Sequence, residues 1–341
     1  MKCYIRNMSA ISPQPTFATD SFLSSVVVPS ADEKCLKAIE PDYKVCIKEA
    51  GLRRRMSHVI KMGVASALNC VEGANGTLPD AIITATGLGC LADTEKFLQS
   101  IIDNDERLLN PTSFIQSTFN TIGGQVALLL KCPCYNFTYV HRGFSFESAL
   151  LDAMMQLEDG DASNVLVGGI DEVTDTEFRV MERMGFWRSG AKMGEGAQFF
   201  LLSSQPTSQD VAQITSLRTF LASASDGTEV ESFLDSCGLT IKDIDCVLLG
   251  ESGDAKMDAT LLSWKESLPA GKMQATFKHL CGEYQTASSF GVWCAANLLR
   301  YQTVPDALRP VGKAEELRRI LVFNSYRNNN CSLFLLEKID R

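Results

Sequence analysis

Residues 278–283 read KHLCGE, and this short segment decides how the rest of the chain is interpreted. The apolar segment Met273–Phe277 before it has the composition of a strand, and Ala287–Arg300 after it has the composition of a helix. The sequence therefore predicts a strand, a tight turn and a helix in close succession. An earlier part of the chain predicts a unit of the same form, with a strand at Asn136–Val140, a turn at His141–Ser145 and a helix at Phe146–Glu158.

These two units belong to a wider internal repeat. The predicted strands Asp80–Ala85 and Asp245–Leu249 occupy matching places, and each ends in a glycine-containing turn. Alternating strands and helices predict an α/β fold with parallel sheets, and an internal repeat favours one compact double domain. We expect an N-terminal half at 1–205 and a C-terminal half at 206–341, with the polar segment Ser203–Gln209 at the seam. The other predicted strands are Cys3–Ala10, Asn164–Gly168, Ala197–Leu202, Ile214–Ser223, Ile320–Asn324 and Cys331–Leu336, and the other predicted helices are Leu52–Cys70, Thr94–Asn104, Gly123–Leu130 and Glu229–Cys237.

The predicted helix Phe146–Glu158 carries an unusually broad apolar surface. Residues 146, 149, 150, 153, 154 and 157 are apolar and form a stripe with helical spacing. Leu151 and Met155 add apolar surface outside this stripe. We therefore expect the helix to be buried on nearly all sides, as a central helix between two sheets.

The composition excludes several classes of function. The 341 residues are 45% hydrophobic and carry a net charge of −9, which makes nucleic-acid binding an improbable role. No run of 18 apolar residues is present, so we expect no membrane span. The twelve cysteines are scattered through apolar segments and are typical of a reduced, cytoplasmic protein. Their spacing predicts no metal site, and no glycine-rich dinucleotide motif indicates a cofactor.

The KHLCGE segment resembles the Lys-x-x-x-Gly-His loop of β-ketoacyl synthases, with Glu283 in place of the histidine. Other segments resemble the same thiolase-like family in the same order, and their order is more specific than any one motif: Tyr4–Pro13, Leu52–Ser57, Thr86–Gly89, Gly168–Glu172 and Gly194–Ala197. The segment YVHRGFS at 139–145 is similar to ketosynthase-like proteins of bacterial aryl-polyene and flexirubin pigment clusters. The resemblance implies a five-layered αβαβα sandwich of two duplicated halves with mixed, mostly parallel sheets, and usually a dimer.

The resemblance also implies a decarboxylative condensation on an acyl carrier protein. In that reaction a cysteine at the start of a helix accepts the acyl group, and the helix N-terminus favours the thiolate. Two histidines then stabilise the charge that develops on the thioester oxygen. In this chain the matching turn falls at Gly143–Ser145, with Gly143 or Phe144 at the nucleophile position, and it contains no cysteine.

Ser145 is the one nearby hydroxyl that could accept an acyl group, with His141 as its only local base. We favour the simpler interpretations, in which Ser145 caps the following helix and His141 belongs to the turn or the core. Residues that the resemblance places around the substrate are Gly143, Phe144, His141, Asn324 and Ser325. The loop after Asn324 and Ser325 lacks the glycines that permit close backbone approach.

Both catalytic histidines of the family are replaced by glutamates in this chain. Glu251 stands at the first position and Glu283 at the second, with Lys278 nearby. A carboxylate about 4 Å from a malonyl carboxylate costs roughly 4 kcal/mol at an effective dielectric constant of 20, and an ionised carboxylate cannot donate a hydrogen bond. Lys278 either pairs with one glutamate in a structural ion pair, which we favour, or crowding of the acids keeps one protonated as a donor.

The preferred hypothesis is a non-condensing protein, similar to a chain-length factor, that pairs with an active ketosynthase and docks an acyl carrier protein. The alternative is an active acyltransferase or condensing enzyme that uses Ser145, or Glu251 and Glu283 with Lys278. A third possibility is a homodimeric protein that binds acyl chains.

Overall fold

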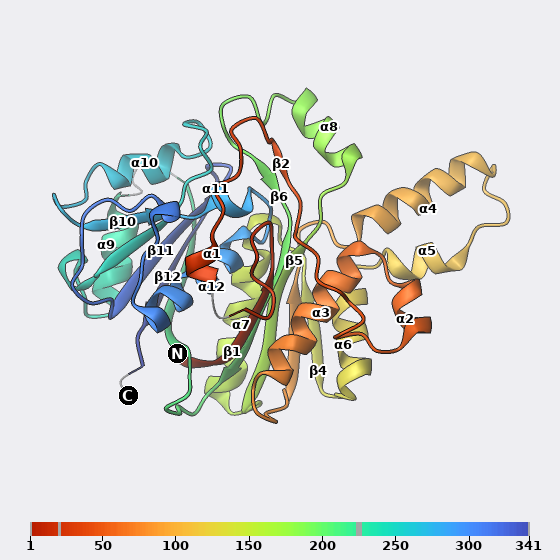
Figure 1. The fold of residues 1–341 in the computed structure, drawn as a ribbon, viewed down its shortest axis with the longest axis horizontal. Coiled ribbons are helices and arrows are strands. Elements are labelled where there is room, and N and C mark those ends of the chain that lie inside the picture. Colours follow the sequence, from red (N-terminus) through yellow and green to blue (C-terminus); the bar gives the residue numbers. More distant parts are fainter. Residues whose placement is uncertain (1, 20–21, 223–226, 340–341) are drawn as a thin grey trace.

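The computed structural model describes residues 2–19, 22–222 and 227–339. Ten strands form one sheet in the order β10–β9–β11–β12–β8–β1–β7–β5–β3–β4 (Figure 1). Their bounds are β1 Cys3–Ile11, β3 Ala81–Ala85, β4 Tyr135–Tyr139, β5 Asn164–Asp171, β7 Gly196–Ser203, β8 Ala212–Leu221, β9 Cys246–Gly250, β10 Met273–Thr276, β11 Arg319–Tyr326 and β12 Asn330–Glu337. The short strands β2 (Cys35–Leu36) and β6 (Met193–Gly194) pair separately.

The two halves have the same sheet topology. In the first half the order is β1–β7–β5–β3–β4, and in the second it is β8–β12–β11–β9–β10. In each half four strands point the same way, while the last strand of the half, β7 or β12, runs against them. A short antiparallel pairing of β1 with β8, at Cys3–Ile5, joins the halves. The predicted boundary at 205/206 falls in the connection between β7 and β8 and stays a prediction.

Side-chain alternation along the strands produces the five predicted layers. Cys246 and Leu248 on β9 share a buried cluster with Phe146 and Phe290 of two central helices, whereas Val247 and Leu249 pack in an outer cluster. The layers are therefore helix, sheet, helix, sheet and helix. The helices are α3 (His58–Glu72) and α6 (Thr121–Leu130) outside the first half, α7 (Ser145–Asp159) and α12 (Ala287–Tyr301) in the centre, and α9 (Gly227–Ser236) and α10 (Ala259–Lys265) outside the second half.

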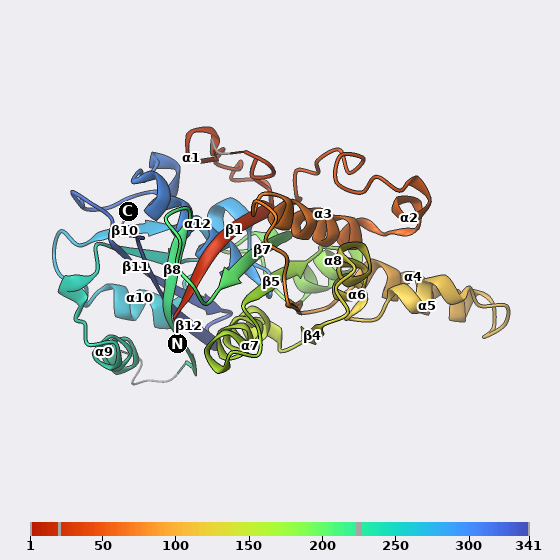
Figure 2. The ribbon, with the colours of Figure 1, turned by 90° about the horizontal axis from the view of Figure 1, so that it is seen from below.

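The remaining helical segments lie at the ends and edges of these layers. Figures 1 and 2 show α4 and α5 projecting from one end of the molecule and α8 standing beside β2 and β6. None of the helices in the described ranges is long and apolar enough to cross a membrane. The bounds are α1 Phe22–Ser25, α2 Ala50–Arg55, α4 Leu91–Asp103, α5 Pro111–Gln116, α8 Asp175–Arg183 and α11 Lys278–Cys281, with 3₁₀ turns η1 Arg142–Phe144, η2 Ile241–Asp243 and η3 Asp306–Leu308.

Three sequence expectations about these elements need correction. The predicted helix Leu52–Cys70 is two helices, because Met56 and Ser57 adopt extended backbone conformations between α2 and α3. The helix α7 is central but is not buried on nearly all sides, since Leu151 and Met155 are 40% and 48% exposed. The predicted strand Ile214–Ser223 corresponds to β8, which ends at Leu221; Ser223 lies outside the described residues.

Candidate functional site

The two turn-then-helix units occupy equivalent places in the two halves. η1 and α7 follow β4, whereas α11 and α12 follow the equivalent strand β10. Strand β12 contacts η1, and Tyr326 at the end of β11 lies against Gly143 in this turn. Arg142 in this turn has φ +50°, a left-handed conformation that is uncommon for a residue with a side chain.

Gly143 lies in this turn against the ring of Tyr326. A Cβ atom added to Gly143 would lie 2.6 Å from Cδ1 and 2.7 Å from Cβ of Tyr326. Carbon atoms do not pack this closely without displacement, because their optimal separation is about 3.5–4.0 Å. Burial raises the pKa of the Tyr326 phenol. The tyrosine therefore occupies the space that a side chain at position 143 would need.

Ser145 stabilises the turn instead of capping the helix. Its hydroxyl accepts a hydrogen bond from the His141 backbone N–H at 2.8 Å and donates one to the Arg142 carbonyl at 2.8 Å. Ser145 is the first residue of α7, and the N-cap position belongs to Phe144. The prediction that Ser145 caps the helix is therefore wrong. Its hydroxyl accepts a hydrogen bond from a backbone N–H that precedes the helix, not from one in the first turn of the helix.

The His141 ring does not reach the Ser145 hydroxyl. Its Nδ1 forms a hydrogen bond of 3.1 Å with the Ser148 hydroxyl, and its ring lies edge-on to Phe144 with 5.8 Å between centroids. His141 is exposed, whereas Ser145 is fully buried. Across the described ranges no contact joins the imidazole to Ser145, so this serine has no base beside it.

Lys278 and Glu283 form a buried ion pair. The Lys278 ammonium donates to both carboxylate oxygens of Glu283, at 2.8 and 3.1 Å, and to the Ser325 carbonyl at 2.7 Å. Both side chains are 1% exposed. Burial raises the pKa of Glu283, while the positive charge of Lys278 acts in the opposite direction. The pairing that we favoured from the sequence is thus present, and it leaves neither group directed at an open space.

Two glycines hold this loop against the first half. The Gly194 N–H donates to the Glu283 carbonyl at 3.1 Å, and the Glu283 N–H donates to the Lys192 carbonyl at 2.7 Å. A Cβ on Gly194 would lie 1.9 Å from the Cys281 carbonyl oxygen. Gly282 has φ +80°, and a Cβ there would lie 2.5 Å from the Gly194 Cα. This close backbone contact requires glycine at both positions.

Glu251 pairs with a different lysine. Its carboxylate accepts a hydrogen bond of 2.5 Å from the Lys265 ammonium on α10, and its side chain is 21% exposed. Within the described part of the chain, no contact joins Glu251 to Lys278 or Glu283. Each glutamate therefore has its own lysine partner, and the expectation that both glutamates occupy one pocket stays a prediction.

Asn324 and Ser325 lie near the end of β11, just before the hairpin. The Asn324 Oδ1 atom is buried without a hydrogen-bond partner among the described residues, and Ser325 contributes its carbonyl to Lys278. Arg327 and Asn328, at the hairpin tip, have φ of +54° and +50°. The Asn329 N–H donates to the Tyr326 carbonyl, which closes a turn of the kind that normally favours glycine. The hairpin tip is left-handed although it lacks the family's glycines, and its non-glycine residues place side chains over the site.

Asp171 and Glu147 are among the buried acids that the sequence reasoning missed. Asp171 joins the halves, accepting hydrogen bonds from the Gly87 N–H at 2.7 Å and from the Thr286 hydroxyl at 2.8 Å. Glu147 accepts a hydrogen bond of 2.7 Å from the Ser332 hydroxyl, and burial raises its pKa to about 7. Glu147 was detectable as an acid within an apolar helix, whereas the contacts of Asp171 and Tyr326 depend on tertiary structure.

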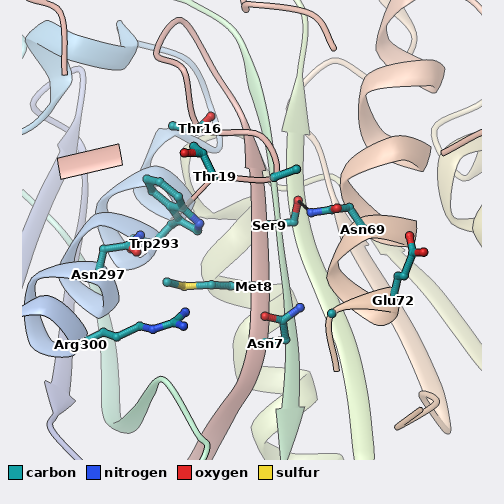
Figure 3. A pocket seen from close by; sticks show the side chains of 12 residues that line it. Asn7, Met8, Ser9, Thr16, Thr19, Asn69, Glu72, Trp293, Asn297 and Arg300 are labelled. Atoms are coloured by element: carbon teal, nitrogen blue, oxygen red, sulfur yellow. Dashed lines mark hydrogen bonds between the residues drawn. The ribbon is translucent and has the colours of Figure 1, made fainter. Parts of the chain in front are cut away.

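One hollow of the surface is lined by residues other than those of the Gly143 turn and the Lys278–Glu283 pair. A polar hollow of about 270 Å³ lies between α3 and α12 above β1, lined by Ser9, Asn69, Asn297 and Arg300 (Figure 3). Arg300 stands near the C-terminal end of α12, while the Lys278–Glu283 pair precedes the N-terminus of that helix. The helix rises about 1.5 Å per residue, so Arg300 lies far from the Lys278–Glu283 pair. The described residues contain no group of three or more potential metal ligands.

Comparison with known proteins identifies the family. Residues 33–228, more than half of the chain, match the model described as "Beta-ketoacyl synthase, N-terminal domain". The chain belongs to the β-ketoacyl synthase family. A search of curated protein sequences gives no match.

Solved structures share the β-ketoacyl synthase fold across the whole chain. The ishigamide ketosynthase/chain length factor has a TM-score of 0.78 at 16% identity and covers 99% of each chain. A β-ketoacyl synthase from Burkholderia phymatum STM815 has a TM-score of 0.78 at 14% identity, covering 99% of this chain and 100% of its own. The ketosynthase ApeO in complex with its chain length factor ApeC, from Xenorhabdus doucetiae, gives 0.73 at 14% identity, with coverage of 99% and 98%. The predicted thiolase-like fold is confirmed.

Proposed function

We propose that this β-ketoacyl synthase relative is a non-condensing subunit that pairs with an active ketosynthase, as a chain-length factor does. The contact between Gly143 and Tyr326 carries the proposal. A condensing enzyme needs a nucleophile at this turn and room for a thioester beside it. Here the turn offers no thiol, and the nearest carbon of Tyr326 would lie 2.6 Å from a Cβ at position 143.

The buried ion pair supports the same proposal. A condensing site needs donors aimed at the oxygen where charge develops. The Lys278 ammonium is already engaged by two Glu283 oxygens and the Ser325 carbonyl. Ionised Glu283 has no proton to donate. Breaking this pair to serve a substrate would leave a buried charge without compensation, at a cost of about 3–5 kcal/mol.

The partner surface that the structure favours is the β4 edge of the sheet. β4 is the terminal strand, so one of its backbone edges is unpaired among the described strands. Tyr135, Phe137 and Tyr139 form a ladder of rings along it, with centroids 6.2 and 5.0 Å apart. Phe137 is 48% exposed, and Leu151 and Met155 of the neighbouring α7 are exposed as well. Exposed apolar surface beside an unpaired strand is typical of a protein–protein interface.

The solved structures agree with such a partnership. One is described as AntDE:AntF, a type II polyketide synthase acyl carrier protein in complex with its ketosynthase bound to the hexaketide. Another is a ketosynthase with its chain length factor. By analogy we propose that this chain acts in the cytoplasm, in fatty-acid, polyketide or aryl-polyene-type synthesis. Its partners would be an intact ketosynthase and an acyl carrier protein.

The test combines co-purification with acyl transfer. The chain is co-expressed with an intact ketosynthase, and sizing is expected to give a 1:1 complex that condenses malonyl groups on the carrier protein. The chain alone, incubated with malonyl- and acyl-loaded carrier protein, is expected to give no condensation and no acylated peptide. Acyl attached to Ser145, or condensation by the lone chain, would establish the enzymatic alternative. A lone homodimer carrying lipid would favour the acyl-binding alternative.

A further inference from the structure

Two helices face each other across the polar hollow beside β1, and each contributes one amide and one charged side chain to it. Asn69 and Glu72 come from α3, whereas Asn297 and Arg300 come from α12. In both pairs the residues are three positions apart, so they are neighbours on one helix face. Figure 3 shows the two pairs on opposite sides of β1.

The amide oxygens of this hollow are available as acceptors. The Asn297 Nδ2 atom donates to the Trp293 carbonyl at 3.0 Å, which identifies the nitrogen because a carbonyl can only accept. The Asn69 Nδ2 atom donates to the Ser9 hydroxyl at 2.9 Å. Among the described residues, neither Oδ1 atom accepts a hydrogen bond, and the Glu72 carboxylate has no hydrogen-bond or ion-pair partner. Asn297 is only 5% exposed, so its oxygen faces little besides the hollow.

Each pair matches a different end of a ligand. On α12, the Arg300 guanidinium has five N–H donors and can receive a carboxylate beside its other contacts, while the Asn297 oxygen can accept from an ammonium group. A carboxylate next to an ammonium is the common part of every free amino acid. On α3, the Glu72 carboxylate and the Asn69 oxygen are both acceptors, which suits a second ammonium group.

The middle of the hollow is apolar and limited in size. Met8 on β1 lies between the two pairs, and the Trp293 ring borders the same hollow (Figure 3). The volume is about 270 Å³. Because a water molecule takes about 30 Å³ in the liquid, this space holds about nine non-hydrogen atoms. A short chain of methylene groups between two polar ends fits these dimensions.

We propose that the hollow between α3 and α12 binds a free basic amino acid of the size of L-ornithine or L-lysine. The carboxylate and α-ammonium groups lie at Arg300 and Asn297, the methylene groups pack on Met8, and the side-chain ammonium lies at Glu72 and Asn69. The net charge of −9 also favours a cationic ligand. This binding site goes beyond the proposed function and does not depend on it.

The proposal is tested by titration calorimetry of the chain alone. L-ornithine and L-lysine are expected to bind saturably with 1:1 stoichiometry. Cadaverine lacks the carboxylate, and L-norleucine lacks the side-chain ammonium, so each should bind at least 5-fold more weakly than lysine. Absence of saturable binding of ornithine and lysine up to about 10 mM would overturn the proposal. Equal affinity for lysine and norleucine would overturn it as well.

A pair of variants locates the binding site. Glu72→Gln removes an exposed charge and keeps the shape of the side chain, so the protein should stay folded while lysine binds at least 5-fold more weakly. Glu266→Gln makes the same change at an exposed glutamate at the end of α10 and should leave the affinity unchanged. Equal affinity in both variants would place the bound amino acid elsewhere and refute this site. Circular dichroism checks that each variant is folded, and the co-purification experiment tests pairing with a ketosynthase separately.

Discussion

The ring of Tyr326 lies where a side chain on Gly143 would project, with 2.6 Å between Cδ1 and the position of that added Cβ. We expect Gly143→Ala to lower the free energy of unfolding by about 1–3 kcal/mol, as overpacking does. In a Tyr326→Gly background the same change should cost much less, because both the ring and the Cβ atom of residue 326 are absent. Urea denaturation of the four proteins measures this coupling. Gly124→Ala, in a helix with nothing within 4 Å, is the control and should stabilise by about 0.5–1 kcal/mol.

The Lys278–Glu283 pair gives a second prediction. Lys278→Met should destabilise the fold by about 3–5 kcal/mol, because it leaves the Glu283 carboxylate buried without its partner. Lys278→Met combined with Glu283→Leu should recover most of this loss, since a buried pair can be replaced by packed apolar groups. Denaturant midpoints of single and double variants measure both effects. Lys265→Met, which breaks the more exposed pair with Glu251, should cost no more than about 1 kcal/mol.

Glu147 should make stability fall as the pH rises. Burial raises its pKa from 4.5 to about 7, so the folded state holds the proton more tightly than the unfolded state. Its contribution is favourable below pH 4.5 and is lost progressively up to about pH 7, by roughly 3 kcal/mol in total. Glu147→Gln should remove this component. Unfolding free energies between pH 5 and pH 8 test it, and identical slopes in both proteins would contradict the assignment.

The stability that His58 contributes should depend on pH in a higher range than the contribution of Glu147 does. Its ring contacts Glu195 at 3.2 Å and Glu40 at 3.2 Å, and hydrogen bonding and charge from Glu195 raise its pKa against the opposing effect of burial. The stability that it contributes is fully present below pH 6.5 and is lost as the pH rises through the raised pKa. A nuclear magnetic resonance titration of the ring should give a midpoint above 6.5. Glu195→Gln should lower that midpoint, and an unchanged midpoint would rule out the carboxylate as the cause.

The face formed by β4 and α7 should control association. Met155→Glu and Phe137→Asp place a charge on exposed apolar positions, so the monomer should remain folded while binding to a co-expressed ketosynthase weakens at least 10-fold. Val45→Glu changes another exposed apolar residue, on a different segment, and is the matched control. Size-exclusion chromatography and titration calorimetry measure the effect. Equal binding by all three variants would place the interface elsewhere.

The architecture could be predicted from the sequence because the two halves repeat the same order of strands and helices. The matching strands Asp80–Ala85 and Asp245–Leu249 correspond to β3 and β9, which hold equivalent places in the two halves. The site was less predictable. The partner of Glu251 lies fourteen residues along the chain on another element, and the ring against Gly143 comes from the far end of the sequence. Such contacts depend on tertiary packing that local patterns do not encode.

The paired glycines at 194 and 282 limit how this protein can be recombined. Since the two backbones touch, a chimera that joins one half to the matching half of a distant homologue must keep hydrogen in place of any side chain at both positions. Gly194 in the first half and Gly282 in the second cannot change independently of each other. Two segments that lie 88 residues apart in the sequence must therefore be compatible with each other.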